Sequence, residues 1–515
     1  MPSPSKINKN ILLVTEGTYP YKGGGVSTWA HYLTQNIKDF DFSLYALTAD
    51  VEYEPLYDLG NSVKEVVQIP VWSPEEPYDC VDYNEEYKTI LMRRELTTYE
   101  NVQNLFVPHF KVFLENTFKD TPQTNAELEA IKQAFIKMWQ FFNNYDYKST
   151  LRSEPVWNCF NYCIANIWPQ TELNSASLQD MSMGIRLIYR FLIPLAIDPP
   201  KAAITHLTIA GTGIIPALKN KEKYGSKTML TEHGVFIRER MLAISKTAYS
   251  PFLKRLLIVF SEMLTRLTYR ECDRILTVSK FNIDWAFRYG AQKEKVSVVY
   301  NGVEASKFVP AKTSSKKERP TVVAAARIFD LKDIITMIKV CAEVRKSIPN
   351  VLFLVYGNKD AVPEYTEQCQ NLIGELALED HFKLAGFHAK PEKLFSEGDI
   401  SILTSISEGF PYTVIESMSC GIPVVATDVG GVSEALTPAC GFICKPRDIE
   451  GISEKVIAIL RDDSLRKKMG GACRERVLEL FTIEQFITRF TKEYKSLTLP
   501  VPQIEKFPLK KIQLA

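Results

Sequence analysis

The sequence of 515 residues lacks any long hydrophobic run. The first apolar stretch, residues 11–14, is too short for the core of a signal peptide. No later segment approaches the roughly 18 apolar residues that a membrane-spanning helix needs. The nearest candidates are residues 187–197, which Arg190 interrupts, and residues 256–264. We therefore expect both segments to form core helices, and we expect a cytoplasmic protein without a membrane span.

Cysteine is too sparse for a disulfide scaffold, with 10 residues in the whole chain. Two Cys-x3-Cys pairs, Cys159/Cys163 and Cys440/Cys444, could in principle bind zinc. Both pairs are isolated from any histidine-rich segment, so we favour buried free thiols over a metal site. This composition is typical of a protein from a reducing compartment.

The sequence also lacks an excess of charge of either sign, because 62 Lys and Arg oppose 61 Asp and Glu. A net charge of +1 gives no bulk electrostatic reason to bind nucleic acid. Apolar residues make up 45% of the chain, as in an ordinary globular protein. No internal repeat is evident. The length exceeds that of one ordinary core and predicts two domains.

The first half begins with "NILLVTEGTYPYKGGGVSTWAHYLTQNI", whose pattern predicts a strand, a glycine-rich loop and an amphipathic helix. From about residue 74 to residue 180 the periodicity is helical, as in "AELEAIKQAFIKMWQFF", which indicates a helical insertion. Strand-like segments resume with "AAITHLTI" and "SKTMLTEHG". We assign residues 1–308 to a first, Rossmann-like domain that contains this insertion.

The second half alternates regularly between strands and helices. Residues 309–320 are polar, rich in Lys and Ser and bounded by prolines, which is typical of a linker. The strand "TVVAAARI", a helix from Asp333, the strand "VLFLVYG", a helix near residues 364–378 and the strand "FKLAGF" follow in order. This order predicts a parallel, doubly wound α/β sheet in a second domain, residues 321–480.

Two carboxylates stand out in "TSISEGFPYTVIESMSCGIPVV", where Glu408 and Glu416 lie eight positions apart. An apolar, β-branched run precedes Glu408, and Pro411 suits the first turn of a helix that contains Glu416. Loops that follow parallel strands lie at the edge where open α/β sheets bind ligands. The sequence therefore places both acids near a predicted ligand site.

Several of these segments carry a resemblance to a known family. "RIFDLKD", "LAGFH" and "SEGFPYTVIESMSCGIPVVATDVGGVSE" resemble the second domain of glycosyltransferase family 4, which has the GT-B fold of two facing Rossmann-like domains. "EGTYPYKGGGVSTW", "TEHGVFIRER" and "YRECDRILTVSKFN" resemble its PelF-like branch, named for a transferase of bacterial Pel exopolysaccharide synthesis. The resemblance covers roughly three quarters of the chain and leaves the insertion unmatched.

The resemblance implies a retaining transfer of a hexose from a nucleotide sugar, such as UDP-glucose, to a glycan or lipid-linked acceptor. It implies no cofactor and no bound metal, a role in exopolysaccharide synthesis and peripheral association with a membrane complex. It also makes residues 481–515 a crossover helix and tail that return to the first domain. A nucleotide-sugar epimerase, a phosphorylase-like enzyme with pyridoxal phosphate and a non-catalytic binding subunit stay open as alternatives.

Within this resemblance, a metal-free enzyme must meet the charge of the leaving diphosphate with cations and backbone donors. Arg327 and Lys332 match the family's basic pair, and the alternative is a solvated surface pair. The N-terminus of the helix near Pro411 adds positive potential, and Gly409 permits close approach of the ligand. Glu408 matches the acid that holds sugar hydroxyls. Glu416 matches the one that holds the ribose diol, since a carboxylate accepts two hydroxyl protons.

From the first domain, His233 matches the active-site histidine that contacts the donor sugar, and we assign it a positioning role without naming a general base. The glycine loop resembles the family's loop that approaches the donor diphosphate, and the alternative is a simple flexible turn. The segment "RER", residues 238–240, could bind an anionic acceptor or the diphosphate, or its side chains could pair with one another. Lys254, Arg255, Arg266 and Arg270 could face anionic lipid, although a solvated helix face is favoured. The predicted site comprises catalytic His233, Glu408, Arg327 and Lys332; donor-binding Gly23, Gly24, Gly25, Gly409, Phe410, Pro411 and Glu416; and acceptor- or phosphate-binding Arg238, Glu239 and Arg240.

Overall fold

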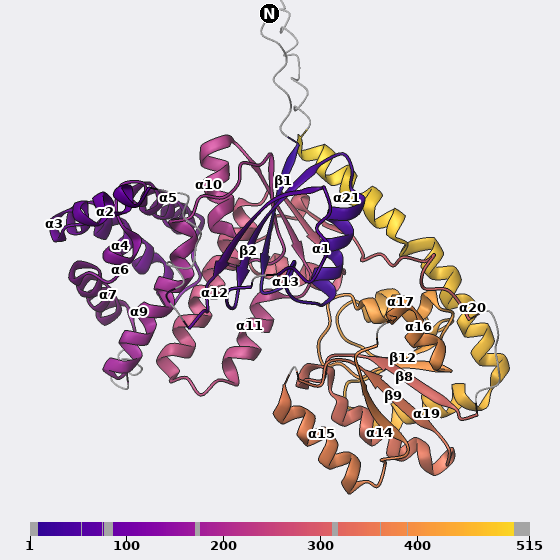
Figure 1. Ribbon diagram of the computed structural model, residues 1–515. Coiled ribbons are helices and arrows are strands. Elements are labelled where there is room, and N and C mark those ends of the chain that lie inside the picture. The colour runs from indigo at the N-terminus through magenta and orange to yellow at the C-terminus, as the bar shows by residue number, and fades with distance from the viewer. Residues whose placement is uncertain are drawn as a thin grey trace, which may run out of the picture.

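The computed structural model describes residues 9–498 except 53, 75, 77–85, 170–175, 312–317, 361 and 389. Half of the predicted linker, the tail after residue 498 and part of the predicted insertion lie outside the described residues. The chain forms two α/β domains that lie side by side, and its last helix returns to the first domain (Figure 1). The predicted pair of Rossmann-like domains is confirmed.

The first domain is built on a seven-stranded parallel sheet of order β3-β2-β1-β4-β5-β6-β7. Its central strand alternates between two cores, since Ile11 and Leu13 face one apolar cluster and Leu12 and Val14 face another. The strand order reverses between β1 and β4, which is the switch point of this sheet. The strands are β1 (Asn10–Glu16), β2 (Asp41–Thr48), β3 (Val63–Pro70), β4 (Ile204–Leu207), β5 (Lys227–Glu232), β6 (Arg274–Thr277) and β7 (Val296–Val298).

Helices cover both faces of this sheet. One face packs against α1 (Gly25–Asn36), and the other packs against α10, α12 and the helices between β3 and β4. Those inserted helices continue beyond residue 180 to the end of α9, and α9 confirms that residues near 187–192 form a core helix. The remaining helices are α2 (Tyr87–Leu96), α3 (Tyr99–Asn101), η2 (Val102–Phe106), α4 (Val107–Thr117), α5 (Asn125–Phe142), α6 (Tyr147–Leu151), α7 (Glu154–Ile167), α9 (Leu178–Leu192), η3 (Ile193–Leu195), α10 (Ile214–Tyr224), α11 (Phe236–Ser245), α12 (Pro251–Glu271), α13 (Phe281–Arg288) and η4 (Lys293–Lys295).

The second domain has a six-stranded parallel sheet of order β10-β9-β8-β11-β12-β13. Its switch point lies between β8 and β11, so the loops after these strands border one crevice. The strands are β8 (Thr321–Ala325), β9 (Leu352–Tyr356), β10 (Phe382–Gly386), β11 (Ile400–Leu403), β12 (Val424–Thr427) and β13 (Gly441–Cys444). The helices are η5 (Asp330–Lys332), α14 (Ile334–Ser347), α15 (Pro363–Glu375), α16 (Pro391–Leu394), η6 (Phe395–Glu397), α17 (Tyr412–Ser419), α18 (Val432–Ala435), α19 (Ile449–Arg461) and α20 (Asp463–Leu480).

The last helix, α21 (Ile483–Thr498), packs on the first domain beside α1 (Figure 1). Phe486, Phe490 and Tyr494 are fully or almost fully buried there, and the Tyr494 hydroxyl lies 2.7 Å from Nδ1 of His206. Phe481 precedes the helix and packs instead in the second domain's cluster. Backbone hydrogen bonds also join the segment after β7 to the start of α21. The Val303 nitrogen donates to the Phe481 carbonyl, and the Ile483 nitrogen donates to the Val303 carbonyl.

No helix among the described residues is long and apolar enough to span a membrane. The nine cysteines in the described part of the chain are buried and free of disulfides, as expected.

Candidate active site

Lys332 and Glu408 meet at the switch point of the second sheet, after β8 and β11. Nζ of Lys332 donates to Oε1 of Glu408 at 2.5 Å, and the Ser405 hydroxyl donates to the same oxygen at 2.5 Å. The two side chains are only 20% and 10% exposed. Thr404, at the end of β11, fixes the loop by donating to the carbonyls of Lys332 and Asp333. The structure thus brings two of the predicted catalytic residues into direct contact.

Arg327 lies at the same edge of the sheet, two residues beyond β8. Its side chain is exposed, and its guanidinium lies 4.9 Å from the centre of the Phe329 ring. In the described part of the chain no carboxylate pairs with it. An exposed, planar donor at a switch point is suited to bind phosphate oxygens.

Gly409 brings the two domains together. A Cβ atom at this position would lie 1.7 Å from the carbonyl oxygen of His233, in the first domain. On the other side, the nitrogen of Gly431 donates to the Gly409 carbonyl at 2.6 Å. Gly430, at φ +57°, is packed equally closely against the Glu408 carbonyl. The loop that carries Glu408 is therefore held between a neighbouring loop and His233.

His233 follows β5 and lies against Trp29 of α1, with ring centroids 4.5 Å apart in an edge-on arrangement. Its Nε2 atom is buried and has no hydrogen-bond partner among the described residues. Burial lowers the pKa of His233 to about 3, so the imidazole is neutral at physiological pH. A neutral ring can contact a donor sugar as a hydrogen-bonding group, and it adds no charge to the site.

Glu416 and the glycine loop lie at the other end of the site. Gly24 has φ +146°, a conformation that favours glycine, and it caps α1. A Cβ atom at Gly25 would lie 3.5 Å from the Tyr412 ring, so the loop faces α17. Burial raises the pKa of Glu416 to about 7, and the nearby Tyr412 hydroxyl is buried without a partner among the described residues. The Glu416 carboxyl and the Tyr412 hydroxyl could each hydrogen-bond to a polar ligand.

The three residues of "RER" diverge in the structure. Nη1 of Arg238 donates to the Ser407 hydroxyl at 2.9 Å, across the domain boundary. Glu239 lies close enough to Arg327, Lys332 and Glu408 to interact electrostatically with their charged groups. Arg240 lies near Glu16 instead. The structure therefore places Arg238 and Glu239 beside the predicted site and Arg240 toward the first sheet.

Phe410 and Pro411 occupy positions that support the fold. The Phe410 side chain is buried, with ring centroids 5.0 Å from Tyr300 and 5.3 Å from Phe481, so it packs in the core. Its carbonyl accepts a hydrogen bond from Asn301. Pro411 caps the N-terminus of α17. Only the backbone at these two positions remains available to a donor.

With this geometry established, the chain can be compared with known proteins. Residues 9–294 match the family model "Domain of unknown function (DUF3492)", and residues 306–476 match "Glycosyl transferases group 1". The first match spans more than half of the chain. The chain belongs to the DUF3492 family, and its second half matches the group 1 glycosyltransferase model.

Curated relatives match this DUF3492 family member over limited regions. N-acetyl-alpha-D-glucosaminyl L-malate synthase of Bacillus anthracis is 26% identical over 239 residues, 45% of this chain and 61% of that protein. Trehalose synthase of Pyrococcus horikoshii is 32% identical over 189 residues, 35% of this chain and 45% of that protein. The chain thus spans roughly half of the length of these relatives.

Solved structures agree with the fold over nearly the whole chain. Sucrose-phosphate synthase from Thermosynechococcus elongatus has a TM-score of 0.60 at 14% identity and covers 95% of this chain and 99% of its own. HepE from Anabaena, in complex with UDP, has a TM-score of 0.57 at 13% identity and covers 94% and 99%. These likenesses show the GT-B fold.

Two acids near the site are not among the residues predicted from the sequence. Glu232, the last residue of β5, accepts hydrogen bonds from the Phe236 nitrogen at 3.0 Å and the Tyr269 hydroxyl at 3.2 Å, and burial raises its pKa to about 7. Glu434 of the second domain accepts from the backbone nitrogens of Lys280 and Phe281. An acid at the end of a buried strand was the available signal for Glu232. No sequence pattern pointed to Glu434.

The basic residues of α12 do not form one solvated face, because three of them contact neighbouring elements. Arg255 pairs with Asp120 and Arg270 pairs with Glu129, both on the helical insertion. The Arg266 guanidinium lies over the Tyr289 ring at 4.9 Å. These contacts tie α12 to neighbouring elements of the first domain. Among the described residues, no three His, Cys, Asp or Glu side chains gather to form a metal site.

Proposed function

We propose that the chain transfers a hexose from a UDP-sugar, such as UDP-glucose, to a glycan or lipid-linked acceptor with retention of configuration. The observation that carries this proposal is the contact of Lys332 and Glu408 at a sheet switch point, next to the close approach of Gly409 and His233 across the domains. In this arrangement a ligand in the crevice meets groups from both halves of the chain.

Each group has a role in this proposal. Arg327, Lys332 and the N-terminus of α17 meet the negative charge that develops on the leaving diphosphate, which makes a bound metal unnecessary. Lys332 has three N–H donors, so it can hold Glu408 and a phosphate oxygen together. Glu408 accepts from sugar hydroxyls, while His233 contacts the sugar near the reacting carbon. Glu416 accepts from the ribose diol.

The finer assignments follow from the sequence resemblance. We place the protein in the PelF-like branch, in the cytoplasm, with peripheral association to a membrane complex that makes exopolysaccharide. The UDP complex of the similarly folded HepE is consistent with a uridine nucleotide as donor. Arg238 and Glu239 are the proposed contacts for the acceptor or diphosphate.

The test is a thermal-shift panel of UDP-, GDP- and ADP-sugars in EDTA, followed by nucleotide release with the best binder. We expect a UDP-sugar to stabilise the protein most, since a ligand that binds only the native state raises its stability. We also expect slow UDP release with donor alone. Formation of an epimer would favour the epimerase alternative. Binding without release in the presence of glycan acceptors would favour a non-catalytic subunit.

A further inference from the structure

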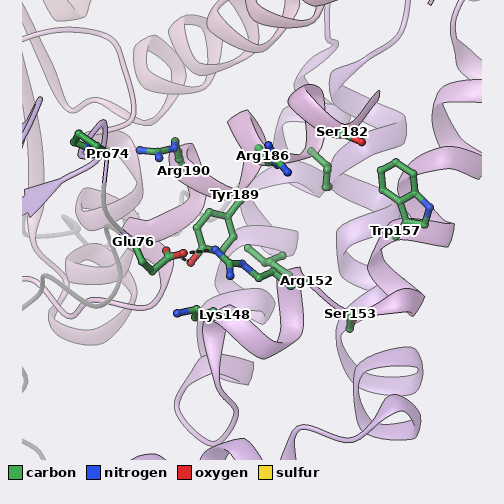
Figure 2. A pocket seen from close by; sticks show the side chains of 12 residues that line it. Pro74, Glu76, Lys148, Arg152, Ser153, Trp157, Ser182, Arg186, Tyr189 and Arg190 are labelled. Atoms are coloured by element: carbon green, nitrogen blue, oxygen red, sulfur yellow. Dashed lines mark hydrogen bonds and ion pairs between the residues drawn. The ribbon is translucent and has the colours of Figure 1, made fainter. Parts of the chain in front are cut away.

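A pocket with a volume of about 790 Å³ lies within the helical insertion (Figure 2), on the side of the first domain that is away from the second domain (Figure 1). Its walls come from the C-terminal end of α6, from α7, from α9 and from the segment after β3. This volume falls in the range of pockets that hold small ligands. None of the site residues predicted above lines it.

The lining is strongly basic. Lys148, Arg152, Arg186 and Arg190 are basic, and Glu76 is the one carboxylate among the lining residues that the structure describes. Glu76 is engaged by Arg152 and by the Tyr189 hydroxyl, and the Arg152 guanidinium lies 5.5 Å from the centre of the Tyr189 ring. The ion pair between Glu76 and Arg152 leaves Arg186 and Arg190 as the cations of α9 at this pocket.

Arg186 and Arg190 lie one turn apart on α9 and both line the pocket, with the Arg190 side chain extending toward Pro74 and the Arg186 side chain extending away from it (Figure 2). Arg190 donates only to neutral groups, the carbonyls of Val71 at 2.7 Å and Ser73 at 3.0 Å. Arg186 is exposed and has no hydrogen-bond or ion-pair partner in the described part of the chain. Like charges at this spacing repel each other, and a bound anion would relieve that repulsion.

The opposite part of the lining suits a sugar ring. Trp157 of α7 and Ile185 of α9 are half-buried and offer apolar surface, while Ser153 and Ser182 offer hydroxyl groups. A hydroxyl both donates and accepts hydrogen bonds, as sugar hydroxyls do. An inorganic anion would use only the adjacent cationic pair. The flat aromatic surface and the polar groups favour a ligand that also carries a sugar ring.

We propose that this pocket binds an anionic saccharide, with its phosphate or carboxylate on Arg186 and Arg190 and its sugar ring against Trp157. This second site on the insertion does not depend on the proposed transfer reaction. It would give the chain a contact with an acidic sugar that is separate from the donor crevice.

The test is calorimetric titration of the full chain with glucose 6-phosphate, glucuronic acid, glucose and inorganic phosphate. Saturating UDP is present so that the residues proposed to bind the diphosphate are already occupied. We expect at least one acidic sugar to bind with one site per chain, at least tenfold more tightly than glucose or inorganic phosphate. Arg186→Gln should weaken this binding by about tenfold or more, as expected for loss of a charged hydrogen bond. Trp157→Leu should weaken binding of the acidic sugar but leave binding of inorganic phosphate unchanged.

Lys137→Gln is the matched control, because Lys137 is exposed on α5 and outside the pocket. Circular dichroism would confirm that each variant is folded. Absence of binding by both acidic sugars, or equal affinity in Arg186→Gln and the parent protein, would overturn the proposal. Equal affinity for inorganic phosphate would overturn its saccharide part. If UDP does not bind at all, only the transfer proposal fails, since the sugar titration needs no donor.

Discussion

Lys332 and Glu408 neutralise each other in the structure, which determines what a change at either residue should do. The Lys332 and Glu408 side chains are only 20% and 10% exposed, and the Ser405 hydroxyl donates to the same carboxylate oxygen as Lys332. Breaking such a pair leaves the remaining charge without its partner. In an occupied site, that remaining charge would be Lys332 beside the diphosphate.

Glu408→Gln should therefore leave UDP affinity unchanged or slightly higher and should lower turnover of the UDP-sugar by a factor of about 100 to 1,000. The freed Lys332 keeps a phosphate partner, whereas the sugar loses a charged acceptor. Calorimetry with UDP and a UDP-release assay measure the two effects. Glu364→Gln, at an exposed position on α15, is the control. Normal turnover in Glu408→Gln would make Glu408 a structural acid.

Arg327→Ala should weaken UDP binding by about 1.5 to 3 kcal/mol, the range for a hydrogen bond to a charged group. The side chain is exposed, so its removal should leave the fold intact. Calorimetry in EDTA measures the change, and Lys339→Ala, at an exposed position on α14, provides the comparison. An unchanged affinity would remove Arg327 from the phosphate site.

Glu416 should make UDP binding depend on pH. Burial raises its pKa to about 7, so the carboxylate becomes protonated as the pH falls through 7. If only the charged form accepts both ribose hydroxyls, the affinity should fall about tenfold from pH 8 to pH 6, in proportion to the competent fraction. Glu416→Gln should lack this component while keeping the titration of UDP itself. Identical pH profiles for the two proteins would contradict the ribose role.

At the scale of elements, the sequence predicted strands and helices well wherever a short apolar run determined them. The runs after residues 10 and 321 became the central strands β1 and β8, and the glycine loop precedes α1 as expected. Spacing indicates which face of an element is buried but not what covers it. The packing of Phe410 against Tyr300 and the ties of α12 to the insertion therefore could not be predicted.

The crossover helix shows the same limit. The helical spacing of Phe486, Phe490 and Tyr494 predicts one buried stripe, and the structure confirms it. The crossover helix predicted from residue 481 begins instead at Ile483, and Phe481 packs in the second domain. A shared period does not reveal where a helix begins.

Phe490→Ala should lower the stability of the first domain by about 3 to 5 kcal/mol, the usual cost of removing a buried phenyl ring. The ring contacts Trp29 at 5.6 Å and Phe486 at 4.8 Å between centroids, so α21 should loosen from α1. We expect UDP affinity to persist, since its proposed groups lie mainly in the second domain, and turnover to fall. Calorimetric unfolding and UDP release test this, with Phe490→Leu as the milder control. Unchanged turnover with a loosened α21 would make this helix peripheral to catalysis.

At the scale of the whole molecule, the account requires that both domains form one site. Contacts across the boundary include Arg238 with Ser407, Lys246 with Asp330, and Glu434 with the N-terminal end of α13. The sequence placed candidate groups on both domains. It could not show that Gly409 touches the backbone of His233, because that contact depends on how the domains meet.

The most direct measurement is UDP release from the best UDP-sugar by Gly409→Ala. The three atoms nearest to a Cβ there belong to the first domain: the carbonyl oxygen and carbon of His233 and, at 3.4 Å, a methyl carbon of Val278. The added methyl group should wedge the domains apart at the site. Gly471→Ala on α20, where a Cβ would meet nothing within 4 Å, is the control. The account predicts UDP affinity within a few fold of the parent and UDP release at least about 100-fold slower, because positioned groups would be displaced. Release at the parent rate from a folded Gly409→Ala protein would contradict a site assembled across the two domains.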